Sequence, residues 1–76
     1  QELDKHQEAL TTLQSALEVH PESPELWLNQ GHSFQALGRT AEAQLSYWRF
    51  MDFSTRRPDL LPQRAWVQNL FTRVKQ

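Results

Sequence analysis

The chain has no cysteine, only two glycines and no long apolar run. The lack of cysteine and the lack of a long apolar run each exclude a class of protein. Without cysteine it can form neither disulfides nor thiolate metal sites. No apolar run approaches the ~20 residues of a membrane-spanning helix, so we expect no membrane partner. The compartment stays open, because a chain without cysteine suits the cytoplasm and the periplasm equally. A chain of 76 residues is one small domain, or part of a larger protein, with a marginal core.

Apolar residues recur at steps of three and four rather than at every second position, which is typical of amphipathic helices. The pattern predicts four helices, over about residues 4–19, 24–37 and 40–55, and from about residue 59 or 62 to residue 75. We expect Pro21 to end the first helix. Ser23 is the expected N-cap and Gly38 the expected C-cap of the second helix, and Thr40 is the expected N-cap of the third. The buried stripe expected on the last helix comprises Trp66, Val67, Leu70, Phe71 and Val74.

Two segments that lie 34 residues apart are similar to each other. Residues 3–9 and 37–43 share leucine, glutamate and alanine at the same places, and a basic residue occupies one further shared place. A repeat of this length indicates helical hairpins that stack, because a single hairpin cannot bury both of its faces.

A longer spaced pattern runs through the first two thirds of the chain. Its residues are Trp27, Gly31, Phe34, Ala43 and Tyr47, with Ala9, Leu13, Ala16 and Pro21 upstream. The pattern resembles the tetratricopeptide repeat family, which has Trp-x2-Leu-Gly-x2-Tyr, then Ala-x3-Phe and Pro. Gln30 stands where the family has leucine, and Phe34 and Tyr47 stand where it has tyrosine and phenylalanine. The resemblance covers about residues 3–54.

The resemblance implies an all-α fold in which antiparallel helical hairpins stack as a right-handed solenoid. One domain over residues 1–76 would contain the second helix of a preceding repeat at 3–20, a complete repeat at 23–55 and a capping helix at 58–76. Two departures place the chain at the C-terminal end of an array. The large Phe50 replaces a small residue, and the proline expected at Thr55 is shifted to Pro58.

Close contact between helices gives a physical reason for the spacing. We expect Gly31 and Ala43 where two antiparallel helices approach most closely, since neither position leaves room for a large side chain. Trp27 is expected to fill the space against the preceding helix, and Phe34 and Tyr47 the layer between adjacent hairpins.

The resemblance also implies a concave groove, lined by the helix over 24–37, that binds a peptide or protein partner. The groove residues would be Glu25, Leu28, Asn29, His32 and Gln35, with Ala36 beside them. The Asn29 amide can hydrogen-bond an extended peptide backbone, although an ordinary solvated polar residue is the alternative. Family members that bind chaperone tails clamp a terminal carboxylate with lysine and asparagine. Leu28 and His32 occupy two of those places, so we expect no binding of such tails.

A second interpretation is a structural or assembly module. Leu45, Trp48 and Phe53 widen the apolar stripe of the third helix, so they form either a docking patch or a surface that the last helix covers. Residues 1–38 carry a net charge of −5 and residues 39–76 a net charge of +4. This division favours a homo-oligomer or docking within a larger protein, unless both halves are ordinary solvated faces.

Catalytic, metal and nucleic-acid sites find no support in the residue pattern. No two of the three histidines are three or four residues apart, and the sequence has no phosphate-binding loop or nucleophile motif. The basic residues of the second half are spread around the last helix, and the aromatic side chains near them are needed for the core. We therefore expect no enzyme activity, no cofactor, no metal and no nucleic-acid partner.

Overall fold

The computed structural model describes the backbone of residues 2–74 and the side chains of residues 4–72. The helices are α1 (Glu2–Val19), α2 (Pro24–Ala36), α3 (Thr40–Phe53), the short 3-10 helix η1 (Pro58–Leu60) and α4 (Leu61–Val74). This part of the chain contains no strand, which confirms the all-helical fold with four α-helices.

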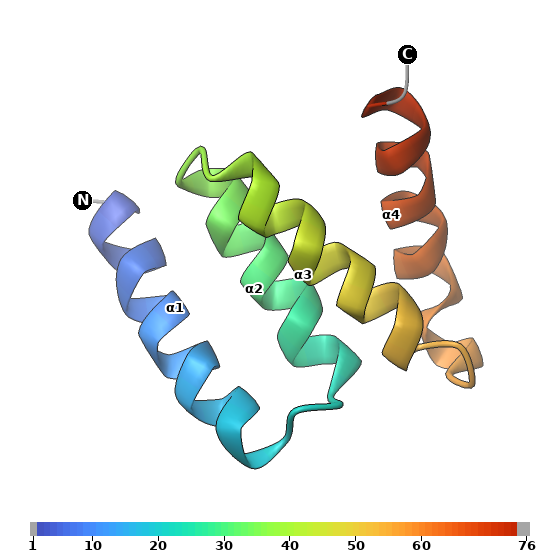
Figure 1. Ribbon diagram of the computed structural model, residues 1–76, viewed down its shortest axis with the longest axis horizontal. Coiled ribbons are helices and arrows are strands. Elements are labelled where there is room, and N and C mark those ends of the chain that lie inside the picture. The colour runs from blue at the N-terminus through green and yellow to red at the C-terminus, as the bar shows by residue number, and fades with distance from the viewer. Residues whose placement is uncertain (1, 75–76) are drawn as a thin grey trace.

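Successive helices run in opposite directions, as Figure 1 shows. α2 packs against α1 on one side and against α3 on the other, so the first three helices form two antiparallel hairpins that share α2. α4 lies beyond α3, on the opposite side from α1. The short loops between helices account for this antiparallel order, because neighbours joined by a few residues must turn back on each other.

The chemistry of the helix ends is partly as predicted. Gly38 adopts a φ of 75°, the left-handed conformation that ends a helix. Ser23 occupies the cap position before Pro24, but its hydroxyl makes no capping hydrogen bond. The prediction that Thr40 caps the third helix is wrong: Thr40 is the first residue of α3. Arg39 is the cap because its carbonyl accepts the first helical hydrogen bond, from Ala43 N–H at 3.0 Å.

The end of α3 differs from the predicted boundary, whereas α4 starts at Leu61, between the two predicted starts. α3 ends at Phe53 rather than near residue 55, and the turn of η1 comes before α4. Pro62 lies in the first turn of α4, where its missing N–H leaves no hydrogen bond unmade. The predicted last residue of this helix, at position 75, lies outside the described residues.

The core lies between all four helices. Its buried apolar residues are Leu10, Phe34, Ala43, Tyr47, Phe50, Leu60 and Val67. Phe50 and Val67 are completely buried, so α4 contributes to the same core as α3. Complete burial of each such side chain stabilises the fold by about 1.5–3 kcal/mol relative to exposure.

Two of the expected contacts take a specific form. A Cβ on Gly31 would lie 2.5 Å from Cε1 of Tyr47, so the small residue of α2 accommodates the Tyr47 ring. Trp27 is half-buried, and its indole N–H donates to the carbonyl of Pro21 at 2.8 Å. This bond ties α2 to the turn that leads out of α1. The ring centroids of Trp27 and Phe53 lie 6.4 Å apart.

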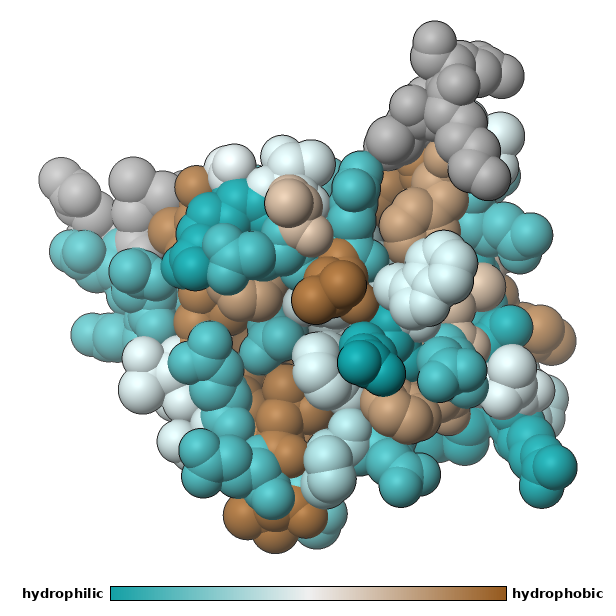
Figure 2. Space-filling view, in the orientation of Figure 1, coloured by the Kyte–Doolittle hydropathy of each residue, from teal (hydrophilic) through white to brown (hydrophobic). Residues whose placement is uncertain are grey.

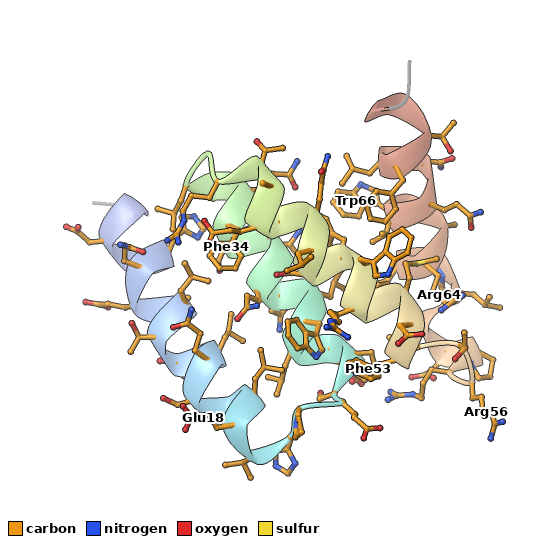
Figure 3. The ribbon with its side chains drawn as sticks, in the orientation of Figure 1. Glu18, Phe34, Phe53, Arg56, Arg64 and Trp66 are labelled. Atoms are coloured by element: carbon orange, nitrogen blue, oxygen red, sulfur yellow. The ribbon has the colours of Figure 1, made fainter. Side chains whose placement is uncertain are left out.

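Arg64 attaches α4 to the end of α3, an anchor that the sequence did not reveal. Its Nη1 donates to the carbonyl of Met51 at 2.8 Å and to the hydroxyl of Ser54, which is completely buried. The last carbonyls of a helix lack helical partners and attract cations. Arg64 therefore both neutralises the end of α3 and fixes the first turns of α4 beside it (Figure 3).

Candidate functional site

Two of the five predicted groove residues line one pocket. Leu28 and His32 from α2 face Pro62, Gln63 and Trp66 from α4 across a shallow pocket of about 270 Å³. We call this space the α2–α4 pocket. Its five residues come from two helices far apart in the sequence, so the pocket exists because side chains of α4, which lies beyond α3, meet those of α2.

Trp66 forms the aromatic wall of this pocket. Its ring centroid lies 5.1 Å from that of His32 and 5.6 Å from that of Tyr47. Figure 3 shows the side chain pointing from α4 towards the neighbouring helices. The prediction that Trp66 belongs to the buried stripe of the last helix is wrong, because 45% of the residue is exposed. Val67, the next residue, takes the completely buried position.

Tyr47 connects the pocket to the core. Only 1% of the residue is exposed, and its hydroxyl donates to Oε1 of Gln35 at 2.7 Å. Nδ1 of His32 lies 3.2 Å from the same hydroxyl oxygen. Burial lowers the pKa of the His32 imidazole and raises the pKa of the Tyr47 hydroxyl to about 12. Both side chains are therefore neutral near pH 7.

The remaining predicted groove residues have different surroundings. Asn29 is exposed on α2. Gln35 is exposed as a residue, but its amide oxygen is bound to Tyr47. Glu25 pairs with Arg57, with Oε2 and Nη2 2.6 Å apart, and this hydrogen-bonded pairing lowers the pKa of the carboxyl group. Glu25 thus ties the start of α2 to the segment before η1.

Arg57 joins two carboxylates at one end of the molecule. Besides Glu25 it contacts Asp59, with Nη2 and Oδ2 2.9 Å apart. Hydrogen bonding to Arg57 lowers the pKa of Asp59 as well. Sequence reasoning missed this cluster because Glu25 and Arg57 are 32 residues apart, and no local signal connects them.

The three residues of the predicted docking patch do not share one environment. Leu45 and Trp48 are 66% and 67% exposed, so α4 does not cover them. Phe53 is half-buried, and its ring lies beside that of Trp27. On the face seen in Figure 2, apolar residues form separate small areas among hydrophilic ones.

Trp48 borders a second hollow, between α3 and α4, which we call the α3–α4 groove. The ring centroid of Trp48 lies 6.1 Å from that of Phe71. The groove has a volume of about 420 Å³ and is lined by Trp48, Met51, Asp52, Thr55, Gln68, Phe71 and Thr72. Its lining combines three large apolar side chains with four polar ones.

Within the described part of the chain, no group of three or more His, Asp or Glu side chains is arranged to hold a metal ion. None of the helices described is long and apolar enough to cross a membrane. The surface features with the clearest potential for recognition are the α2–α4 pocket and the α3–α4 groove.

Comparison of this chain with protein-family models, with curated proteins and with solved structures found no match. The tetratricopeptide resemblance thus stays a prediction that rests on the spaced residues of α1, α2 and α3. What the structure establishes for residues 2–74 is an all-helical fold with four α-helices and with surface hollows beside α4, among them the α2–α4 pocket and the α3–α4 groove.

Proposed function

We propose that this chain is a protein-interaction module that binds a peptide or protein segment at the α2–α4 pocket, without catalysis. One observation carries the proposal: Leu28 and His32, which the sequence assigns to a binding groove, line a common pocket with Trp66 of α4. An exposed tryptophan beside an aliphatic side chain is the kind of anchor site that dominates many interfaces.

The shape of the site suits a peptide. Asn29 lies one residue after Leu28 on α2 and is exposed, and Gln63 contributes an amide at the pocket itself. An extended peptide needs hydrogen-bond partners for its backbone and a recess for its side chains, and this surface offers both. The pocket is small, so it fits one or two side chains rather than a whole helix.

The repeat interpretation is part of the same proposal. Two antiparallel hairpins sharing α2, with Gly31 against Tyr47, support a tetratricopeptide-like arrangement in which residues 23–55 form one repeat. In that arrangement α4 caps the C-terminal end of a right-handed array, and the pocket belongs to its concave side. The attachment of Arg64 to the end of α3 supports this capping role.

A peptide library displayed on phage tests the proposal. Peptides selected on the whole chain should lose at least about tenfold in affinity when Asn29→Ala and Gln63→Ala are combined. Both side chains are exposed, so the melting temperature should stay unchanged. Gln14→Ala, on the exposed face of α1, is the matched control. Selected peptides that bind the double variant and the wild-type chain equally well would rule out the pocket as the binding site.

A second candidate function is assembly, and the exposure of Leu45 and Trp48 favours it. Large apolar side chains on a surface are typical of docking sites. The opposite net charges of the two halves of the chain support head-to-tail self-association. Sedimentation measurements at micromolar concentration, in low and in high salt, test this role. Trp48→Ser should abolish a salt-sensitive dimer, whereas a monomer throughout would contradict assembly of this chain with itself.

A further inference from the structure

Hydrogen bonds around Tyr47 indicate which nitrogen of the neutral His32 imidazole carries the proton. The Tyr47 hydroxyl donates its one proton to Oε1 of Gln35. Its oxygen therefore accepts a hydrogen bond from Nδ1–H of His32, which lies 3.2 Å away. A neutral imidazole carries a single N–H, so Nε2 of His32 has a free lone pair and acts as an acceptor. The pocket wall that His32 provides is thus an acceptor rather than a donor.

The rest of the lining adds an aromatic face and a second acceptor, but no charged side chain. Trp66 is partly exposed, and an indole face attracts cations more strongly than any other side-chain ring. The amide oxygen of Gln63 is a further acceptor. Leu28 and Pro62 complete the lining with apolar surface.

A cluster with a net negative charge precedes the pocket lining along the chain on both sides of the pocket. Glu25 and Asp59 share Arg57 as their partner, so the three side chains together carry a charge of −1. Glu25 precedes Leu28 by three residues on α2, and Asp59 precedes Pro62 by three residues at the start of α4. The cluster is thus beside the lining that both helices contribute. All three side chains are partly exposed, so their field acts mainly within the ~8 Å screening length at physiological salt.

The arginines closest in sequence to the pocket lining are engaged in other contacts. Arg57 is held by the two carboxylates, and Arg64 donates to the carbonyl of Met51 at the end of α3. An anionic ligand in the pocket would meet the net negative cluster and the lone pair of His32, with the amide N–H groups of Gln63 as donors. A cationic ligand would meet the lone pair of His32, the amide oxygen of Gln63, the Trp66 ring and the net negative cluster.

We propose that the α2–α4 pocket selects a peptide segment that carries a lysine or arginine side chain, an inference that rests on the proposed function of the same pocket. The aliphatic stem packs on Leu28 and Trp66, because long cationic side chains bury their methylene groups on apolar surface. The charged end donates a hydrogen bond to Nε2 of His32 and is attracted by the cluster around Arg57.

Affinity for such a segment should fall when His32 is protonated. Protonation removes the acceptor at Nε2 and places a positive charge beside the bound cation. Tyr47 is the titratable side chain in contact with the imidazole, and it stays neutral. Gln35 and Trp66, the other neighbours, carry no charge. Burial lowers the pKa of His32, so affinity stays constant through neutral pH and decreases on the acid side of about 6.5.

The test uses the whole chain and four short peptides, acetyl-Gly-Gly-X-Gly-Gly-amide, with X as lysine, arginine, norleucine or glutamate. Binding is followed by NMR through the indole N–H of Trp66 and the ring protons of His32. The lysine and arginine peptides should bind about tenfold more tightly than the norleucine peptide. Saturating lysine peptide should lower the His32 midpoint, because the peptide binds the neutral form preferentially.

His32→Asn separates recognition from packing. The asparagine amide can still donate to the Tyr47 hydroxyl but lacks the acceptor at the position of Nε2. This variant should keep only part of the preference for the lysine peptide over the norleucine peptide, because Trp66 and the cluster around Arg57 remain, and it should lose the acid-side decrease that His32 causes, while the norleucine affinity stays as in the wild type.

Two outcomes would overturn the inference, and they differ in what else they affect. Equal binding of all four peptides at Trp66, or tighter binding of the glutamate peptide, would overturn cation selection and leave the pocket as a peptide site. Absence of any shift at Trp66 and His32 with these peptides and with phage-selected peptides would overturn the inference together with the proposed function.

Discussion

The Tyr47 ring occupies the space where a side chain on Gly31 would begin. A Cβ at position 31 would lie 2.5 Å from Cε1 and 2.7 Å from Cδ1 of this ring. The ring cannot move away freely, since it is almost completely buried and its hydroxyl is bound to Gln35. The same hydroxyl positions His32 at the α2–α4 pocket. One close contact between α2 and α3 therefore controls both the core and the pocket wall.

The substitution Gly31→Ala should destabilise the protein. Alanine favours a helix over glycine by about 1 kcal/mol, but overpacking against a ring as buried as that of Tyr47 costs about 1–3 kcal/mol. We expect a net loss of about 1 kcal/mol or more in the free energy of unfolding, measured by urea denaturation with far-UV circular dichroism.

Tyr47→Leu provides the control for this steric explanation. Combined with Gly31→Ala, it should cost less than the sum of the two single changes, because the shorter side chain vacates the space beside position 31. If the two costs simply add, or if Gly31→Ala stabilises the protein, the ring is not what excludes a side chain there.

Gly38 should respond to substitution for a different reason. A Cβ at this position would meet no atom within 4 Å, but the φ of 75° is unfavourable for L-residues. Gly38→Ala should therefore cost about 1 kcal/mol through backbone strain, and Gly38→Asn less, because asparagine tolerates this region. Thermal unfolding measures both. The chain is short enough for chemical synthesis, and D-alanine at position 38 should stabilise the protein.

Gly38 also illustrates what the sequence can predict. A glycine directly after an apolar helical pattern is a local signal, and local chemistry determines the end of α2. The prediction that Thr40 is the cap was wrong because the hydrogen bond from Ala43 N–H to the Arg39 carbonyl starts the helix one residue earlier. This start depends on the path of the turn, which the residue pattern does not encode.

The candidate site was predictable only where it depends on α2. Helical spacing places Leu28 and His32 on one face, and in the structure both line the α2–α4 pocket. The prediction that Trp66 is buried was wrong because spacing shows that it shares a face with Leu70 but not how far the neighbouring helices cover that face. The position of α4 depends on contacts distant in sequence, such as that of Arg64 with Met51. The α4 side of the pocket therefore required the structure.

The bond between Arg64 and the end of α3 should hold α4 in place. In Arg64→Met the chain keeps most of the packing of the side chain but leaves the Met51 carbonyl and the buried Ser54 hydroxyl without this donor. Loss of a charged donor of this kind costs about 1.5–3 kcal/mol. Amide hydrogen exchange should speed up throughout α4 and less in α1. Arg49→Met, an exposed arginine on α3, is the control and should leave exchange in α4 unchanged.

The pairing of Glu25 with Arg57 should make stability depend on pH in the acid range. The pairing lowers the pKa of the folded carboxyl group below its value in the unfolded chain. The unfolded state therefore binds more protons at mildly acid pH, and the contribution is complete above the unfolded pKa and lost as pH falls through the folded one. NMR titration of the Glu25 carboxyl carbon should show a midpoint below that of an unpaired glutamate.

Arg57→Met should raise that midpoint towards the usual value, because the largest cause of the shift is the hydrogen bond from Arg57. Arg56→Met removes the same charge one residue earlier, from a side chain that points away from the molecule in Figure 3, so the Glu25 midpoint should not move. Equal shifts in the two variants would mean that general charge, and not the hydrogen-bonded pair, lowers the pKa. The same comparison tests the cluster next to the pocket, because without Arg57 the two carboxylates carry a charge of −2 and should bind the lysine peptide more tightly.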